Sequence, residues 1–401
     1  MGKRVVITGA GVVSPIGTGL KAFAAGLRAG RSAAAPIQAF DTEKYPFKLA
    51  HEVKNFDARA LGTHLLDPFI QYAVKAADEA LRDARFDPSG VDPYRIALSV
   101  SSSKGGMHTL DRFKARFTAR PSAILGARIY ANLVPNFAAQ WIARRWKIQG
   151  PAKCYVAACA TGTVAVEEGA HMIAGGQADY CLAGASDASI VPLMLAGYRQ
   201  MKALSDTGMR PFHKNRDGFL VGEGAGIVFL ESLESARARG AQIYAEVLGA
   251  AQGTDSTHAL HFSPDENALS RTVKKLLQKI DRGPQDVGYV NLHGTATRAG
   301  DIYETEQLKK AFGSQAASIP MSATKAMTGH MLGASGAVEI IICLLAMQDG
   351  FLPPTAGLDD PDPACDLDYV AGAARPAKIN TAISVSMGFG GHVATLALGK
   401  L

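Results

Sequence analysis

The chain has 401 residues, a formal net charge of +6, and a composition that is 47% hydrophobic and 19% charged. That length can bury a large core and favours two or three domains, and the balanced composition excludes a disordered or fibrous chain. The positive charge mildly favours an acidic partner, but without an aromatic–basic stripe or a recognised motif it does not indicate nucleic-acid binding.

The cysteines and the chain ends indicate the compartment. Five cysteines, at positions 154, 159, 181, 343 and 365, form no CxxC pair and no metal-ligand spacing. We therefore expect free thiols, a reducing compartment and no metal site. The N-terminus reads as a strand and turn, not as a signal peptide, and the longest apolar run, 340–347, suits a core helix better than a membrane span. We expect a cytoplasmic protein without a membrane partner.

Strand-like and helix-like segments alternate along the first half of the chain. The expected strands are 4–7, 95–100, 180–183 and 227–230, and the expected helices are 20–29, 69–82 and 231–240. The stretch Gly9–Pro15 resembles a dinucleotide loop, but Ser14 replaces its third glycine, so we predict a turn and no nicotinamide cofactor. The glycines of 217–226 predict a close backbone crossing, since no Gly-Lys-Ser/Thr follows them.

A second unit of the same kind begins near Tyr244. Its expected helices are 267–280, 307–312 and 337–348, and its expected strands are 287–292, 381–385 and 393–398. Alternation of strands and helices throughout predicts an α/β protein in layers. We expect two domains, 1–242 and 243–401.

The stretch Tyr155–Thr163 contains the first candidate for chemistry, Cys159. An apolar run, small residues and a helix-compatible segment predict a strand, a sharp turn and a helix. A thiol at a helix N-terminus faces unpaired N–H groups and the positive end of the dipole, which lower its pKa. Its backbone N–H could also serve an oxyanion. The sequence around Cys159 alone leaves open a buried, inert cysteine.

Two histidines, a lysine and a glutamate form the second group of candidates. His293 follows a buried strand, and Lys325 and His330 share a loop that opens a helix. Glu339 lies in an apolar run, so its carboxyl group must be paired or neutral. The carboxyl ends of strands are where α/β proteins form ligand sites.

Four ordered motifs resemble those of the β-ketoacyl-acyl-carrier-protein synthases of the KAS I/II type. They are Ala158-Cys159-Ala160, Asn291-Leu-His293-Gly-Thr295-Ala-Thr297, Thr324-Lys325-x-x-x-Gly329-His330 and Gly388-Phe389-Gly390-Gly391. The resemblance runs from about Lys3 to the C-terminus. It implies the thiolase-like five-layer αβαβα fold with two similar α/β halves, and usually a homodimer.

The resemblance also implies roles for these residues. Cys159 would carry the acyl group, and His293 and His330 would donate to the enolate formed from malonyl carrier protein. Lys325 and Glu339 would organise the charge around the histidines. The backbone N–H groups of Cys159 and Phe389 would form the oxyanion hole, with Phe389 also acting as a gate. Further substrate contacts are expected at Thr295, Thr297, Met387 and Lys104.

The expected function is that of a 3-oxoacyl-[acyl-carrier-protein] synthase. It would perform a decarboxylative Claisen condensation in type II fatty-acid or polyketide synthesis. We expect no bound cofactor, since the phosphopantetheine arm of the carrier is part of the substrate. An acidic acyl carrier protein would dock through Lys202 and Arg120, and the chain would form a homodimer or pair with a related subunit.

Several positions depart from the family pattern. The last motif usually reads Asn-Ser-Phe-Gly-Phe-Gly-Gly-Thr-Asn, whereas this chain has Val385-Ser-Met387-Gly-Phe-Gly-Gly-His392-Val393. His258, His261 and His392 adjoin the gate and are not expected to be catalytic. Lys104 stands where a small or apolar residue usually lines the far end of the acyl pocket, so it would face a partner residue or a polar substrate, or shorten the pocket.

Three alternatives remain to be weighed against a condensing enzyme. The first is a non-catalytic or partner-dependent subunit of a ketosynthase heterodimer. The family's inactive subunits lack the nucleophile, so the presence of Cys159, His293 and His330 counts against it. A Cys–His hydrolase would release a free acid, and the pattern of two histidines disfavours it. A thiolase would need a second catalytic cysteine in a late glycine-rich loop, and residues 386–392 contain none.

Overall fold

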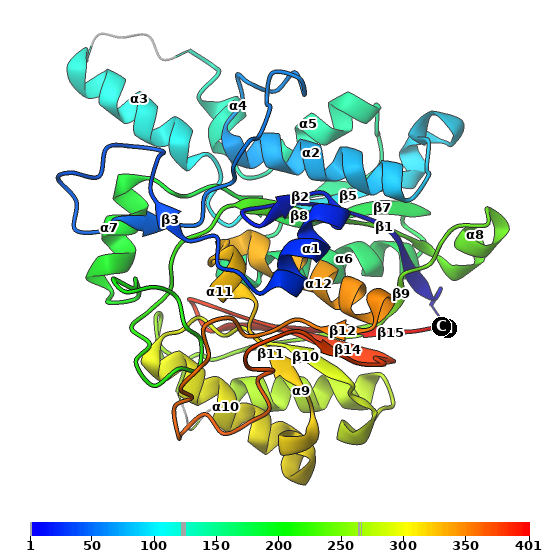
Figure 1. Ribbon diagram of the computed structural model, residues 1–401. Coiled ribbons are helices and arrows are strands. Elements are labelled where there is room, and N and C mark those ends of the chain that lie inside the picture. The colour runs from blue at the N-terminus through cyan, green and yellow to red at the C-terminus, as the bar shows by residue number, and fades with distance from the viewer. Residues whose placement is uncertain (1, 122–125, 264, 266) are drawn as a thin grey trace.

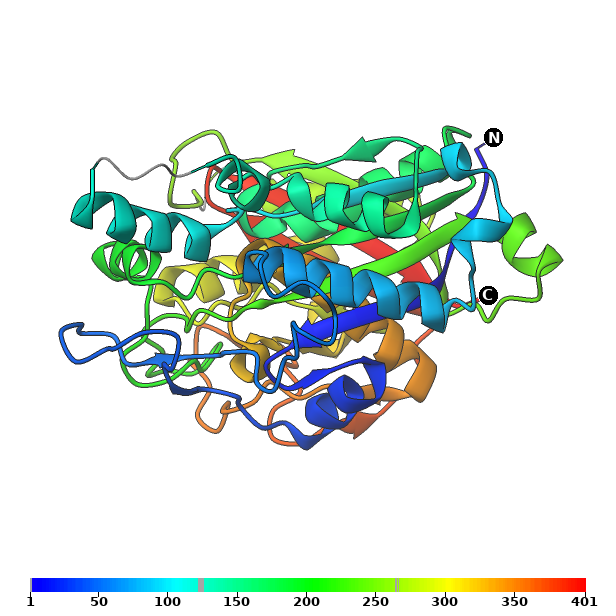
Figure 2. The ribbon, with the colours of Figure 1, turned by 90° about the horizontal axis from the view of Figure 1, so that it is seen from above.

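The computed structural model describes residues 2–121, 126–263, 265 and 267–401. Helices and sheets alternate in five layers, with helices outside, two sheets beneath them and helices in the middle (Figure 1). This confirms the predicted α/β class and the five-layer arrangement. The two ends of the chain lie on the same side of the molecule (Figure 2).

The first half forms one sheet in the order β1-β8-β7-β5-β6. Its strands are β1 (Val5–Ser14), β8 (Gly224–Ser232), β7 (Tyr180–Asp187), β5 (Ile96–Ser101) and β6 (Ala152–Lys153). The first two pairings are antiparallel and the last two are parallel. Helices α2 (Pro68–Asp83) and α5 (Phe137–Trp146) cover the outer face, and α6 (Thr161–Ala174) covers the inner face.

The second half repeats this order as β9-β15-β14-β10-β11, with the same pattern of antiparallel and parallel pairings. Its strands are β9 (Ala245–Thr254), β15 (His392–Gly399), β14 (Thr381–Gly388), β10 (Tyr289–Asn291) and β11 (Met321–Ser322). Helices α9 (Ala268–Lys279) and α10 (Arg298–Phe312) cover its outer face, and α12 (Ser335–Asp349) lies inside. The two sheets join where β1 pairs with β9.

The remaining elements are shorter or lie at the edges. The helices are α1 (Leu20–Ala29), α3 (Met107–Ala119), α4 (Tyr130–Leu133), α7 (Pro192–Gln200), α8 (Leu233–Ala238) and α11 (Lys325–Thr328). The strands are β2 (Gly17–Thr18), β3 (Ala35–Pro36), β4 (Leu49–Ala50), β12 (Phe351–Leu352) and β13 (Arg375–Pro376). Helix α3 lies at the periphery in both views (Figures 1 and 2).

The inner helices α6 and α12 meet at their first turns. A Cβ atom added to Gly162 would lie 2.5 Å from the backbone nitrogen of Ala337, and one added to Gly336 would collide with Thr163. Glycine is therefore required on both sides of this crossing. The contact brings together the two loops that precede these helices.

Helix α12 is the core helix that the apolar run predicted. The segment Leu332–Asp349 is long and apolar enough to cross a membrane by length and composition, but 89% of it is buried inside the protein. A helix that is apolar on all sides packs in a protein interior as well as in lipid. Here the two sheets and α6 surround it.

Two predicted local structures are wrong. Residues 9–14 lie within β1 and do not form a turn, because Gly9 and Gly11 let the backbone of α2 pack directly on the strand. Residues 155–158 are not a strand; the chain leaves β6 at Lys153 and runs irregularly to a 3₁₀ turn. By contrast, the glycines of 217–226 do mark close crossings, for example of Gly222 past Thr328.

Candidate active site

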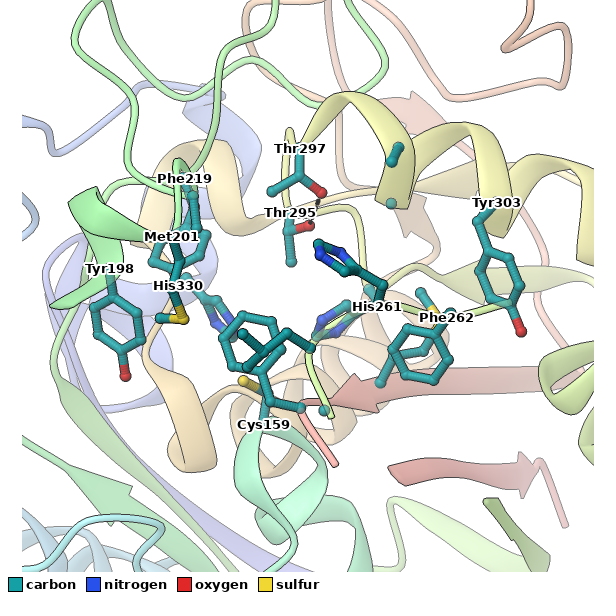
Figure 3. Close-up of a pocket in the computed structure, with 18 of the residues that line it drawn as sticks. Cys159, Tyr198, Met201, Phe219, His261, Phe262, Thr295, Thr297, Tyr303 and His330 are labelled. Carbon is teal, nitrogen blue, oxygen red and sulfur yellow. Dashed lines mark hydrogen bonds between the residues drawn. The ribbon is translucent and has the colours of Figure 1, made fainter. Parts of the chain in front are cut away.

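One cavity of about 620 Å³ brings together the candidate residues of both halves (Figure 3). Cys159 comes from the first half, and His293 and His330 come from the second. The lining also includes Thr295, Thr297, Met387, Phe389 and Lys202. Eight of the predicted site residues thus surround one space, although they are spread over more than half of the sequence.

The turn that carries Cys159 has a strained backbone that one hydroxyl group holds in place. Cys159 lies in a 3₁₀ turn, Ala158–Ala160, directly before α6. Ala158 has a φ of 48°, a left-handed conformation that is unfavourable for a residue with a Cβ. The Thr161 hydroxyl donates to the Ala158 carbonyl at 2.7 Å and accepts from the Ala157 N–H at 2.9 Å. These bonds fix the thiol at the N-terminal end of α6.

The pKa of Cys159 is raised, whereas the sequence predicted that a helix N-terminus would lower it. The residue keeps some exposed surface toward the cavity, but the surrounding protein removes most of the water from the thiol. This burial raises the pKa of Cys159 to about 11, while the charges of Lys104 and Lys325 act in the opposite direction. The resting group is therefore a thiol, so a role as nucleophile would require transfer of its proton to a neighbouring base.

The end of β14 lies against the turn that carries Cys159. A Cβ atom on Gly388 would be 2.9 Å from the backbone nitrogen of Cys159, so only glycine permits this approach. Phe389 follows directly and lines the cavity. The strand is further tied to α6 by a 2.8 Å hydrogen bond between the hydroxyls of Ser386 and Thr163.

His293 is positioned through its backbone. Its N–H donates to Glu304 at 2.7 Å, the N–H of Gly294 donates to the same carboxylate at 2.8 Å, and Lys325 donates to the His293 carbonyl at 2.6 Å. Nδ1 of His293 is buried and has no hydrogen-bond partner among the described residues. Burial, followed by the charges of Lys325 and His330, holds the pKa of His293 well below its usual value.

His330 lies close to His293 in a second buried setting. The two rings are 5.5 Å apart and nearly perpendicular, at 86°. Nδ1 of His330 is 3.1 Å from the Ser335 hydroxyl, and its ring packs edge-on against Phe219 at 5.1 Å. Burial and the charge of Lys325 hold the pKa of His330 well below its usual value. Both imidazoles are therefore neutral at pH 7, so each offers one N–H donor and one acceptor.

Glu339 has the ion-pair partner that its apolar surroundings require. The ammonium of Lys325 forms an ion pair with the Glu339 carboxylate, and both side chains are buried. Burial raises the pKa of Glu339, and Lys325 opposes that shift. The pair holds a positive charge next to the two histidines, which favours their neutral form.

Several buried carboxyl groups that position the candidate residues were not predicted from the sequence. Asp187 accepts hydrogen bonds from the hydroxyls of Ser102 and Ser103, both at 2.6 Å, and from the Gly333 N–H at 2.7 Å. It thereby joins β7, the turn after β5 and the turn before α12. Asp187 follows the expected strand 180–183, and this position at the end of a buried strand was the one available signal.

Glu304 and Asp301 were not predicted, because in the sequence they look like ordinary polar residues of a helix. Burial raises the pKa of both carboxyl groups to about 7. Asp301 accepts from the backbone N–H groups of Phe212 and Ala296 at 2.7 and 3.0 Å, and its carboxylate is 3.4 Å from the buried Arg216. These contacts fix the loop that follows His293.

The other predicted residues lie farther from the cavity centre or outside it. Lys202 is exposed and lines the cavity, whereas Lys104 is half-buried and does not line it. The backbone N–H of Lys104 donates to Asp187 at 3.3 Å. Arg120 is exposed at the C-terminal end of α3. No group of three or more metal-ligating side chains occurs within the part of the chain that the structure describes.

The fold and the cavity define a class of protein: a thiolase-like condensing enzyme, which is an acyltransferase. Comparison with known families gives the same answer. Residues 2–236 match the beta-ketoacyl synthase N-terminal domain, and residues 244–359 match the beta-ketoacyl synthase C-terminal domain. The chain belongs to the beta-ketoacyl synthase family.

Similar proteins cover the whole chain. The 3-oxoacyl-[acyl-carrier-protein] synthase 2 of Synechocystis is 37% identical over 99% of this chain and 98% of its own length. That of Coxiella burnetii is 37% identical over 100% and 99%. Among solved structures, the ishigamide ketosynthase/chain length factor has a TM-score of 0.95 at 34% identity, and a beta-ketoacyl synthase from Burkholderia phymatum has 0.92 at 30%, both covering 100% of each chain. The resemblance inferred from the four motifs is confirmed.

Proposed function

We propose that this chain is a 3-oxoacyl-[acyl-carrier-protein] synthase that extends an acyl group held on Cys159. The observation that carries this proposal is the convergence of Cys159, His293 and His330 on one cavity, with the Lys325–Glu339 pair directly behind the histidines. A nucleophile and two neutral donors around one space suit a thioester reaction with an enolate intermediate.

The first half-reaction transfers an acyl group to the enzyme. The sulfur of Cys159 attacks the carrier thioester, a new carbon–sulfur bond forms, and the carrier thiol leaves. One of the two neutral imidazoles accepts the proton of the Cys159 thiol, because burial keeps that thiol protonated at rest. The proton then passes to the departing carrier thiolate.

The second half-reaction uses malonyl carrier protein. The bond between its carboxyl carbon and methylene carbon breaks, carbon dioxide leaves, and the electron pair enters an enolate whose oxygen accepts hydrogen bonds from His293 and His330. The methylene carbon then bonds to the acyl carbonyl, and the carbon–sulfur bond to Cys159 breaks. A proton from water restores the thiol of Cys159, and the 3-oxoacyl group stays on the carrier.

The tetrahedral intermediate needs its own donors. We assign that role to the backbone N–H groups of Cys159 and Phe389, because Gly388 brings the end of β14 within contact of the nucleophile turn. Loss of one such donor typically lowers the rate by about 100- to 1,000-fold. Phe389 would also act as the gate for the extender unit.

The partner is an acidic acyl carrier protein whose phosphopantetheine arm enters the cavity. Lys202 is exposed at the cavity and Arg120 is exposed on α3, so both are available for docking. Thr295 and Thr297, whose hydroxyls are 3.1 Å apart, would contact the arm, and Met387 the substrate. One similar solved structure, with a TM-score of 0.92 at 29% identity, is that of a type II polyketide acyl-carrier protein in complex with its ketosynthase. No further cofactor is required, and a cytoplasmic location fits this reaction.

The quaternary structure has two candidates. A homodimer is the expectation from the family, and pairing with a related subunit is the second. One similar solved structure is that of the ishigamide ketosynthase/chain length factor. This similarity supports pairing with a related subunit. The repeated strand order of the two halves supports our division of the chain into 1–242 and 243–401.

One experiment tests the proposal. The protein is incubated with a panel of acyl carrier proteins, and the mass of the Cys159 peptide is measured. We expect an acyl adduct there, followed by carbon dioxide and the 3-oxoacyl product when malonyl carrier protein is added. Cys159→Ala should abolish the adduct, and Cys154→Ala, which removes the other half-buried thiol, should keep it. A protein that yields no adduct with any primer would contradict the proposal.

A further inference from the structure

A loop next to the gate brings a third imidazole into the cavity. Leu260, His261 and Phe262 line the same space as the cysteine and the two buried histidines. Figure 3 shows the ring of His261 inside the cavity on the side of Thr295 and Thr297. Nothing in the reaction described above uses this side chain.

The loop is held in a defined position by the hairpin of β14 and β15. The N–H of Asp255 donates to the Gly391 carbonyl at 2.9 Å, and the N–H of Gly390 donates to the Ala259 carbonyl at 2.7 Å. The carboxylate of Asp255 accepts from the Ser263 N–H at 2.7 Å, which closes the loop. The position of His261 is therefore tied to the residues that follow Phe389.

The imidazole of His261 stacks on a neighbouring ring but forms no hydrogen bond with the described residues. Its ring stacks on His258 at 4.9 Å and 25°. Nδ1 of His258 accepts the Leu260 N–H at 3.0 Å, so His258 stabilises the loop. Within the described ranges, no hydrogen bond or ion pair involves the side chain of His261, and the residue is exposed to the cavity. Its N–H is free to bind a substrate.

The neighbouring polar groups either have partners or carry a permanent cation, as Lys202 and Arg298 do. The hydroxyls of Thr295 and Thr297 contact each other, and Nε of Arg298 donates to the Arg216 carbonyl at 3.3 Å. Lys325 is committed to Glu339 and to a backbone carbonyl. His261 thus offers an uncommitted N–H donor on the side of the cavity that Leu260, His261 and Phe262 form.

We propose that His261 donates a hydrogen bond to the carboxylate of the malonyl extender unit. This inference rests on the proposed function and adds the recognition of that substrate. If His293 and His330 bind the thioester oxygen, a further group must hold the carboxylate at the other end of the three-carbon unit. That carboxylate leaves as uncharged carbon dioxide, so a single hydrogen bond suits it better than a permanent cation, which would stabilise the ground state.

The role differs from the expectation that His261 is not catalytic, because the side chain would touch the extender. The primer has no carboxylate, so His261 acts only in the second half-reaction. Loss of a hydrogen bond to a charged group typically weakens binding by about tenfold or more. A contact with the phosphopantetheine arm would affect both half-reactions equally.

Binding to the non-reactive Cys159→Ala protein tests the inference without requiring turnover. Calorimetry compares malonyl-pantetheine with propionyl-pantetheine, which lacks the carboxylate. We expect the preference for the malonyl compound to fall about tenfold when His261→Ala is added. His261→Gln, which keeps a donor, should restore part of it, and His64→Ala, a change at an exposed histidine elsewhere, should leave it intact.

The kinetic counterpart uses the protein with Cys159. His261→Ala should raise the KM for malonyl carrier protein in carbon dioxide release and leave acylation of Cys159 unchanged. An unchanged malonyl preference, or equal losses for both compounds and both half-reactions, would overturn the role of His261. Absence of any acyl adduct in the unmodified protein would instead contradict the proposed function, whatever the binding data show.

Discussion

The two halves of the molecule share one strand order but hold their active-site groups by different forces. In the first half, Cys159 is fixed by a strained backbone at Ala158 and by the Thr161 hydroxyl. In the second half, buried charges fix the histidines: Glu304 binds the backbone at His293, and Lys325 pairs with Glu339.

The difference follows from what each group must do. In the proposed reaction the thiol of Cys159 needs open space and nearby backbone N–H donors, and a local turn held by the Thr161 hydroxyl can provide both. The two imidazoles are kept neutral chiefly by burial and further by the charge of Lys325, and a buried cation requires a buried anion as its partner. The same topology therefore holds Cys159 by a local turn and its hydrogen bonds, and holds the two imidazoles by contacts to buried ionisable side chains.

The largest expected effect comes from removing one charge of the buried ion pair in the second half. Glu339→Gln leaves the ammonium of Lys325 buried without its counter-charge, and loss of one partner of such a pair typically costs about 3–5 kcal/mol. We expect a loss of unfolding free energy of that order in urea denaturation. The exposed pair of Lys309 and Asp366 provides the control, since Asp366→Asn should change stability by less than about 1 kcal/mol. Equal effects in the two variants would refute the assignment.

A smaller loss is expected from the packing that joins the halves. Gly162→Val inserts a side chain where a Cβ would lie 2.5 Å from the Ala337 nitrogen. Overpacking of this kind typically costs about 1–3 kcal/mol, and here it would also move Cys159 away from His330. Urea denaturation and the acylation rate measure the two consequences. Gly197→Ala, on the exposed face of α7 with open space around it, should leave both nearly unchanged.

The next prediction concerns the pH dependence of the nucleophile. Burial raises the pKa of Cys159 to about 11, so the thiolate fraction grows as pH rises toward that value. In the absence of carrier, the rate of alkylation by iodoacetamide should therefore continue to rise above about pH 9, measured as the mass of the Cys159 peptide over time. A plateau near about pH 8.5, the range of an ordinary thiol, would show that burial does not control the pKa of Cys159.

The smallest expected effect tests whether the charge of Lys104 also influences the pKa of Cys159 in the first half. The charge of Lys104 lowers the pKa of Cys159, so Lys104→Met should move the alkylation midpoint to higher pH. The shift should be smaller than the difference between Cys159 and an ordinary thiol, since burial is the larger cause. Lys114→Met, on the exposed face of α3, serves as the control. A midpoint that does not move would show that Lys104 has no electrostatic role at the nucleophile.

Local sequence patterns predicted most of the fold. The expected helices 20–29 and 69–82 correspond to α1 and α2, and the expected strands 381–385 and 393–398 lie within β14 and β15. The two failures have one cause. Glycines in 9–14 and small residues before Cys159 look the same in a turn, a strand or a crossing, and the partner that decides among them lies far away in the chain.

The sequence by itself determined the layered α/β class, the order of the elements and the choice of Cys159, His293 and His330 as candidate site residues, because hydrophobic periodicity and motif residues are local properties. Only the tertiary structure decided which groups surround them. Asp187 and Glu304 position the site through contacts that the sequence does not display, and the raised pKa of the thiol results from burial by both halves together. Burial and charge pairing depend on where distant segments meet, so they are properties of the folded chain.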